Sequence, residues 1–242
     1  DFVLDGRGLL LKWLVLIAIL TLLLYAVMRP DKYNYAFYEN EQGGASYMIF
    51  ALCSFLVLSI GASQFSQNMT SSGKRLNTLM SPCSTLEKYI CRWLIYVVGV
   101  TIMFLVSFAI AEGLRVLIIK AYYGDIPGLH YVSISEYPLR DGEFGLFCLW
   151  ILAVQATFVL GSTIAPKNAF LKTAGVNVLI CVVFSIAISC TYKLTMHPGY
   201  LPSQESETIL IYLTRGFPIC WTIFCYITAY FRMKESEIIE RL

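Results

Sequence analysis

Long runs without charge are the feature that most constrains this chain. Ala45 to Gln64 and Trp93 to Ala111 contain no Asp, Glu, Lys or Arg. A helix that crosses a bilayer needs roughly 20 mostly apolar residues, because the hydrocarbon core is about 30 Å thick. Since 57% of the 242 residues are hydrophobic and the mean hydropathy is +0.66, the composition is typical of a membrane protein with several spans.

The apolar runs predict an all-α membrane protein in which residues 1–242 form a single transmembrane domain. Six spans are expected, at about residues 9–28, 45–64, 93–111, 144–165, 173–192 and 216–233. Spans four and five are joined by the short basic connection Pro166 to Lys172, which predicts a helical hairpin. No cleavable signal peptide is recognised.

Two polar residues close the third span. Glu112 and Arg115 have the i,i+3 spacing at which helical side chains meet, so we expect an ion pair at the membrane surface. The long loop from Gly113 to Glu143 would follow. The alternative, an intramembrane proton or substrate site, requires these two residues to lie deeper in the hydrocarbon.

A broken external segment is expected before the last span. Lys193 to Glu207 is interrupted by Pro and Gly, which predicts a loop. Arg215, Gly216 and Pro218 then predict a short interfacial helix that ends near Thr214, followed by the sixth span. The charged residues after Phe231 predict an aqueous tail.

The longest polar and basic interruption runs from Phe65 to Arg92. Within it, Ser84-Thr85-Leu86-Glu87 fits the Ser-x-x-Glu capping box, so a helix is expected to begin at Ser84. Pro82 disfavours a helical conformation for the residue before it, which predicts a kinked element ahead of that helix. A capped element with apolar residues at a membrane surface favours docking into a protein groove. The alternative is an ordinary connection that packs on its own helices.

Basic residues predict the orientation. With six spans, the termini, the Phe65 to Arg92 loop and the Pro166 to Lys172 connection share one side, which holds eleven Lys and Arg against seven on the other. The positive-inside rule therefore places both termini in the cytoplasm.

Catalytic and cofactor motifs are not found. The two histidines, His130 and His197, have no Glu-x-x-His partner, and no metal-ligand spacing or Gly-x-Ser-x-Gly motif occurs. Ser72 to Arg75 lacks the glycine and hydroxyl residues of a phosphate-binding loop. We therefore expect a chain that is not an enzyme and holds no cofactor or metal. A net charge of +2 gives no reason to expect nucleic acid as a partner.

The chain resembles the permease subunits of type-2 ABC exporters. Within that family, it is most similar to the variants that are common in Bacteroidota. The sequence Leu79-Met80-Ser81-Pro82-Cys83-Ser84-Thr85-Leu86-Glu87-Lys88-Tyr89 is similar to a phrase of those variants, with Cys83 and Tyr89 in place of Ala and Phe. The short loop Lys167 to Thr173 and the broken segment before the last span also match. The family has an amphipathic helix before span one. In this sequence, at most Asp1 to Gly8 correspond to that helix.

This resemblance implies an inner-membrane exporter subunit of a bacterium, with both termini cytoplasmic. Its partners would be a separate ABC ATP-binding subunit, a second copy or homologue of the permease, and the lipid bilayer. The family's coupling helix, which docks on the ATPase, maps onto Leu79, Met80, Pro82, Ser84, Glu87 and Lys88. The near absence of intramembrane charge favours an amphipathic cargo over a small ion.

Two other classes of function are weighed against the exporter. One is a non-transporting membrane scaffold or sensor subunit that docks a soluble partner through residues 74–92. The other is a membrane enzyme, which the missing catalytic constellation disfavours. An ABC ATP-binding subunit encoded beside this chain would favour the exporter.

Overall fold

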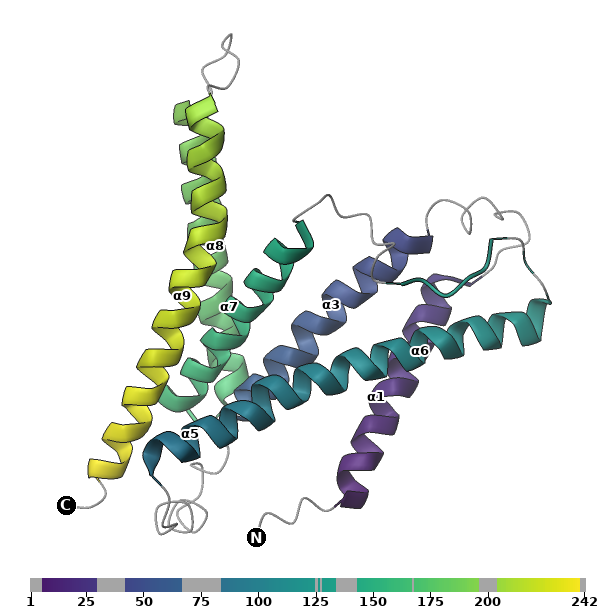
Figure 1. Ribbon diagram of the computed structural model, residues 1–242, viewed down its shortest axis with the longest axis horizontal. Coiled ribbons are helices and arrows are strands. Elements are labelled where there is room, and N and C mark those ends of the chain that lie inside the picture. Colours follow the sequence, from purple (N-terminus) through teal and green to yellow (C-terminus); the bar gives the residue numbers. More distant parts are fainter. Residues whose placement is uncertain are drawn as a thin grey trace. The chain divides into compact units, whose positions relative to one another are not determined.

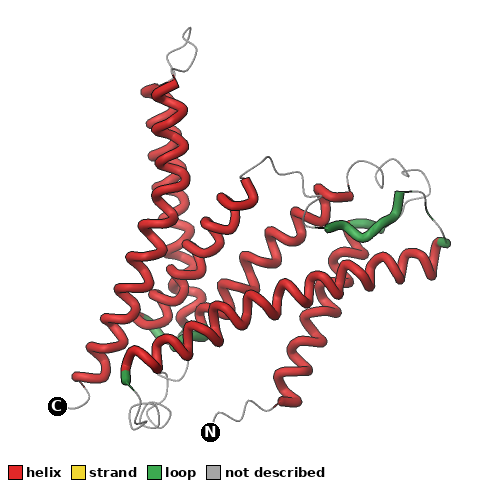
Figure 2. Tube along the Cα trace, viewed as in Figure 1, coloured by secondary structure: helices red, strands yellow, loops and turns green. Residues whose placement is uncertain are grey.

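Helices make up the secondary structure of the part of the chain that the structure describes. The computed structural model describes residues 6–29, 42–66, 84–124, 126, 128–133, 143–166, 168–195 and 204–239. In these residues every regular element is a helix (Figures 1 and 2). Four of the helices are long and apolar enough to cross a membrane, namely Gln42–Ser63, Thr85–Tyr123, Phe144–Ile164 and Ala169–Ala187. The predicted all-α class is confirmed, and the protein is membrane-embedded in character.

Four helices lie over predicted spans with ends close to those expected. They are α1 (Gly6–Val27), α3 (Gln42–Ser63), α7 (Glu143–Ile164) and α8 (Ala169–Thr195). The 22 residues of α3 extend for about 33 Å, which is enough to cross the hydrocarbon. In α1 the apolar stretch Leu11–Val27 is shorter than the lengths of the four candidate spans.

The third predicted span is part of a much longer helix. It begins as α5 (Thr85–Trp93), continues as a π-helical segment, η2 (Leu94–Gly99), and ends as α6 (Val100–Tyr123). The expectation that helix ends near Ala111 and a loop starts at Gly113 is wrong. The helix stops only at Gly124, whose φ of 78° suits glycine and whose N–H donates to the Lys120 carbonyl.

The predicted break before the last span is also wrong where the structure describes it. One helix, α9 (Gln204–Ile239), runs through Arg215, Gly216 and Pro218. The Thr222 hydroxyl donates to the Pro218 carbonyl at 2.6 Å. Proline is tolerated in apolar helices where neighbouring helices and Ser or Thr side chains satisfy the backbone. The charged residues after Phe231, expected as a tail, continue α9, whereas residues 196–203 lie outside the described part.

The chain divides into two compact units. The first contains residues 1–58 and 99–141, and the second contains residues 59–98 and 142–242. In the first unit α1 packs along α6. The Trp13 indole N–H donates to the Ser107 hydroxyl at 2.6 Å, and the Phe50 ring meets the Phe108 ring edge-on at 5.1 Å. These contacts fix α1 and α3 against the same helix; the single transmembrane domain stays a prediction.

In the second unit α7 packs against both α8 and α9. Its core contains Ala62, Phe65, Val97, Phe158, Val159 and Ala229. The hairpin predicted for spans four and five is confirmed, because α7 and α8 approach closely at their connected ends. A Cβ atom on Gly161 would overlap the side chain of Thr173, so this crossing requires glycine on α7.

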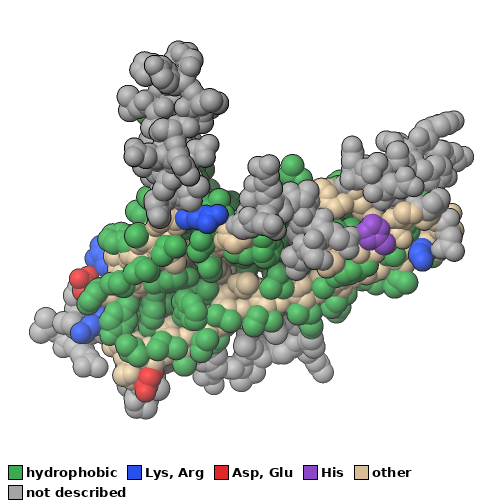
Figure 3. Space-filling model, turned by 45° about the horizontal axis from the view of Figure 1, so that its top comes forward, with side chains coloured by type: hydrophobic (Ala, Val, Ile, Leu, Met, Phe, Trp, Pro, Cys, Tyr) green, Lys and Arg blue, Asp and Glu red, His purple; other side chains and the backbone are tan. Residues whose placement is uncertain are grey.

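Hydrophobic side chains cover much of the visible face in Figure 3. Along α8 the most exposed include Val178, Leu179, Val183 and Ile186, each more than half exposed. Contiguous apolar surface of this kind is rare on soluble monomers but is the normal lipid-facing surface of a membrane helix. The exposed apolar side chains therefore suit helices that contact lipid, which the length of their apolar stretches also indicates.

Candidate functional site

The predicted capping box is present at the start of α5. Ser84 is the N-cap, with φ −65° and ψ 152°, and its hydroxyl accepts from the Glu87 N–H at 3.3 Å. In return the Ser84 N–H donates to Glu87 Oε2 at 2.9 Å. Two N–H groups at the helix start are thereby satisfied. The prediction that a helix begins at Ser84 is confirmed.

The cap also acts on the charge of Glu87. This carboxylate is solvent-exposed, and hydrogen bonds from the Ser84 backbone and then the Ser84 side chain hold its pKa below the usual value. Hydrogen bonds to a charged form favour that form. A negative charge near a helix N-terminus is also favourable to the helix dipole. The charged cap therefore marks the polar end of the 39-residue helix Thr85–Tyr123.

One face of α5 packs on other elements of the second unit. The Tyr89 hydroxyl donates to the Tyr226 carbonyl on α9 at 3.0 Å, and its ring lies edge-on to Phe65, with centroids 5.4 Å apart. Trp93 meets the Tyr226 ring at 6.1 Å. These aromatic contacts hold α5 against α9 and the end of α3.

The face of α5 next to this aromatic face is apolar and exposed. Leu86 is 51% exposed and Ile90 is 45% exposed, at the i,i+4 spacing of one helical face. Lys88 is half-buried and Arg92 is buried, so the basic side chains lie toward the protein. An exposed apolar pair beside a charged cap is a surface that a protein groove can cover.

The six residues predicted for the coupling helix are only partly described. Ser84, Glu87 and Lys88 lie in the cap and first turn of α5. Leu79, Met80 and Pro82 lie outside the described residues. The role assigned to all six remains a prediction, although the capped helix that three of them form is confirmed.

A second polar feature lies at the other end of this long helix, in the first unit. Arg115 pairs with Glu112 at 2.7 Å, and both side chains are essentially inaccessible to solvent. The predicted pair is confirmed and is enclosed by protein, while its place at the membrane surface stays a prediction. Each residue is 0% exposed, within a helix that continues to Tyr123.

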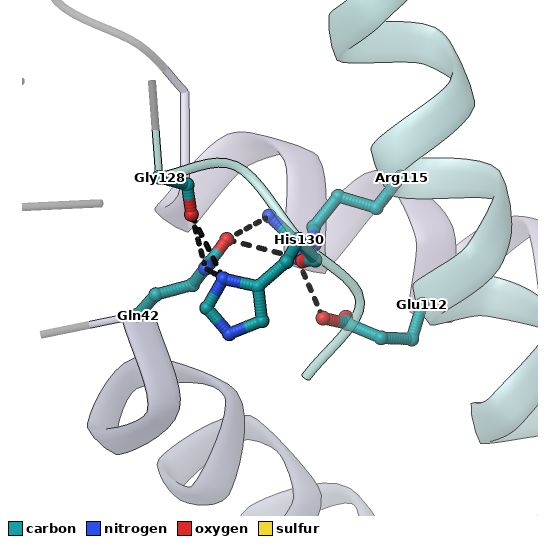
Figure 4. Close-up of polar contacts among 5 residues, drawn as sticks. All are labelled: Gln42, Glu112, Arg115, Gly128 and His130. Atoms are coloured by element: carbon teal, nitrogen blue, oxygen red, sulfur yellow. Dashed lines mark hydrogen bonds and ion pairs between the residues drawn. The ribbon is translucent and has the colours of Figure 1, made fainter. Parts of the chain in front are cut away.

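Arg115 also binds two other segments, as Figure 4 shows. Its two terminal nitrogens donate to the Gln42 Oε1 atom, each at 3.2 Å. One of them also donates to the His130 carbonyl at 3.1 Å. Gln42 is the first residue of α3, and His130 belongs to segment 128–133. One guanidinium therefore ties α3, α6 and segment 128–133 together.

The hydrogen-bond pattern fixes the roles of the Gln42 amide and the His130 ring. Because Gln42 Oε1 accepts from Arg115, Gln42 Nε2 faces the Gly128 carbonyl at 3.4 Å and His130 Nδ1 at 3.2 Å. His130 Nδ1 lies 2.8 Å from the same carbonyl, which can only accept. Nδ1 therefore carries hydrogen and donates to Gly128, which also receives the Gln42 amide.

Two atoms of the ion pair have no hydrogen-bond partner in the described residues, Glu112 Oε2 and Arg115 Nε. On the outer side of α6 at the same level, Leu117 is 64% exposed and Ile118 is 41% exposed. The pair is thus surrounded by protein on one side and apolar surface on the other. Buried pairs of this kind are sensitive to loss of one partner.

Gln42 and His130 were not singled out as site residues from the sequence. Both lie in polar stretches that read as loops, and 73 residues separate Gln42 from Arg115. Arg115 itself is the sequence feature that could have indicated these partners. It precedes the apolar residues Val116 to Ile119, where an unpaired arginine would be costly, so a remote partner could have been sought.

Comparison with known proteins identifies no relative. No protein-family model, curated protein or solved structure matches this chain.

Proposed function

We propose that this chain is the membrane-spanning permease subunit of an ATP-binding cassette exporter. ATP would be hydrolysed by a separate subunit, and the cargo is an amphipathic molecule. The observation that carries the proposal is the capped helix α5, which exposes Leu86 and Ile90 and continues directly into an apolar helix long enough to cross the bilayer. This joins a docking surface to a span without an intervening loop.

The length of Thr85–Tyr123 supports this arrangement. Its 39 residues extend for about 58 Å, well beyond the roughly 30 Å of hydrocarbon. Glu87 and Lys88 at its first turn favour water, so α5 is the part that projects from the hydrocarbon. A partner that moves α5 moves a spanning helix with it.

Six spans, with α1 and α9 as the first and last, complete the proposed subunit. The chain would lie in the cytoplasmic membrane of a bacterium, with both termini and α5 in the cytoplasm. Leu79, Met80 and Pro82 would extend the docking surface formed by Ser84, Glu87 and Lys88. One such chain supplies half of an exporter pathway, so two copies or homologues would assemble with two ATPase subunits.

The test places a photo-reactive amino acid at Leu86 in the native host, with the same amino acid at Leu152 of α7 as a control. Leu152 is 42% exposed and apolar but lies on a spanning helix. We expect Leu86 alone to capture a protein that contains a phosphate-binding loop. In proteoliposomes, the wild-type chain should stimulate ATP hydrolysis by the captured protein. The double variant Ser84→Ala plus Glu87→Ala should not stimulate it.

Membrane insertion of the double variant is the control for folding, because neither substitution touches a span. Capture of a partner without a nucleotide-binding motif would instead support the scaffold or sensor function. A double variant that stimulates its ATPase like wild type would show that α5 is only a connector. Assembly is tested by native mass spectrometry, where a monomer under all lipid conditions would contradict the two-permease arrangement.

A further inference from the structure

The buried guanidinium of Arg115 distributes its hydrogen bonds unevenly (Figure 4). A guanidinium has five N–H donors, one on Nε and two on each terminal nitrogen. Nη2 bonds to three acceptors, which are Glu112 Oε1 at 2.7 Å, the His130 carbonyl at 3.1 Å and Gln42 Oε1 at 3.2 Å. Nε has no partner in the described residues. Three acceptors therefore share the two hydrogens of Nη2 while the neighbouring donor is unused.

The planar shape of the guanidinium identifies the hydrogen that is shared. Gln42 Oε1 accepts from both terminal nitrogens, so it lies on the edge between them and takes one hydrogen from each. The second hydrogen of Nη2 lies on the other edge, beside Nε. Glu112 Oε1 and the His130 carbonyl are the acceptors left for it, so they compete for one hydrogen.

Glu112 has a second oxygen with which to win this competition. A carboxylate binds the edge of a guanidinium strongly through two parallel N–H···O bonds. Glu112 Oε2 and Arg115 Nε are both buried and have no partner in the part of the chain that the structure describes. A rotation of the carboxylate that brings Oε2 to Nε would satisfy both atoms, which otherwise cost free energy. It would also draw the shared hydrogen away from the His130 carbonyl.

We infer that Arg115 alternates between two arrangements, and that segment 128–133 is a strap that closes and opens with them. In the closed arrangement, which the structure shows, Arg115 holds the His130 carbonyl. In the open arrangement Glu112 binds Nε and Nη2 together, and the strap loses its bond to Arg115. Gln42 keeps its bonds to Arg115 in both, because it uses the other edge, so the start of α3 stays in place. The inference does not depend on the proposed function.

Arg115→Lys tests the competition for one hydrogen. An ammonium keeps the positive charge but has three separate hydrogens and no edge that fits a carboxylate. Each of the three acceptors can then take its own hydrogen, so the strap should be held closed more firmly than in wild type. The net contribution of one hydrogen bond corresponds to a change of about threefold to tenfold in the ratio of open to closed strap.

The populations are measured from the distances between two spin labels by double electron–electron resonance in nanodiscs. One label is placed at Tyr131→Cys in the strap and the other at Leu117→Cys on α6, both exposed positions, in a chain whose native cysteines are replaced. We expect two populations in wild type. Arg115→Lys should lower the open-to-closed ratio by about threefold to tenfold. Glu112→Gln should lower it too, because the amide nitrogen that replaces one oxygen cannot accept from Nε.

The matched control is Arg232→Lys on α9. Arg232 pairs with Glu235 at the same i,i+3 spacing but in an exposed position, so this variant should leave the distribution unchanged. A single narrow population in wild type would overturn the strap, and this measurement needs neither variant to fold. An open population that rises in Arg115→Lys, or one that Arg115→Lys and Arg232→Lys alter equally, would overturn it as well.

Discussion

Replacing Arg115 by Met removes the cation that holds the buried polar cluster together. The variant loses the 2.7 Å bond to Glu112, both 3.2 Å bonds to Gln42 and the 3.1 Å bond to the His130 carbonyl. It leaves the Glu112 carboxylate fully buried without a countercharge. Breaking one partner out of a buried ion pair destabilises proteins by about 3 to 5 kcal/mol.

The pair should also show strong coupling. Arg115→Met together with Glu112→Met removes both charges, and the remaining unsatisfied Gln42 oxygen costs roughly 1 to 3 kcal/mol. The double variant is therefore expected to be more stable than Arg115→Met and less stable than wild type. This order distinguishes a charge effect from a simple loss of packing.

The chain offers a matched control at Arg232. It pairs with Glu235 at the same i,i+3 spacing, but at 3.4 Å and with side chains that are 54% and 58% exposed. Exposed pairs contribute about 0 to 1 kcal/mol, so Arg232→Met should have little effect.

Thermal unfolding in nanodiscs, followed by tryptophan fluorescence, measures these differences. For a chain of this size each kcal/mol lowers the Tm by roughly 2 to 4 °C, so Arg115→Met should lower it by about 6 to 20 °C. A Tm for Arg115→Met that equals that of Arg232→Met would refute the reasoning. A double variant whose Tm is no higher than that of Arg115→Met would also refute the reasoning.

Three further predictions follow from the structure. Gly161→Ala should destabilise the α7–α8 crossing by about 1 to 3 kcal/mol, and Thr173→Ala should restore part of the loss in thermal unfolding; an unchanged Tm would contradict the close approach. Because Ser84 lowers the pKa of Glu87, the capping box is intact above the ordinary glutamate pKa and is lost as pH falls through the lowered value; carbon NMR of the Glu87 carboxyl should show a higher pKa in Ser84→Ala, and an equal pKa would argue against the cap. Cysteine at Tyr122 should react with an impermeant reagent on intact cells and cysteine at Glu87 only after permeabilisation; reaction of both before permeabilisation would contradict the orientation.

Local patterns predicted the features that depend on neighbouring residues. The capping box needs only Ser84 and Glu87, three positions apart, and the structure contains both of its bonds. The apolar runs likewise located the helices, because hydropathy over about 20 residues decides whether a helix is stable in lipid. Neither feature requires knowledge of a distant partner.

The wrong helix ends have a different origin. Arg115 was expected to end a span because a charge normally seeks water, but its charge is met by Glu112 and by Gln42 from another helix. Pro218 was expected to break α9, but the helix continues where α7 packs along it. For Arg115 a tertiary contact supplies what the local sequence lacks, and a rule based on neighbouring residues cannot identify that contact.

Gln155 shows how a polar residue in an apolar run can indicate a contact with a distant part of the chain. It is the sole Asn or Gln in the apolar run from Phe144 to Ala165, and no neighbour in that run explains it. An amide kept in an apolar helix indicates a hydrogen-bond partner on another segment. In this structure the acceptor is the Val97 carbonyl in the π-helical segment, so an isolated amide in one helix indicates a contact with another helix.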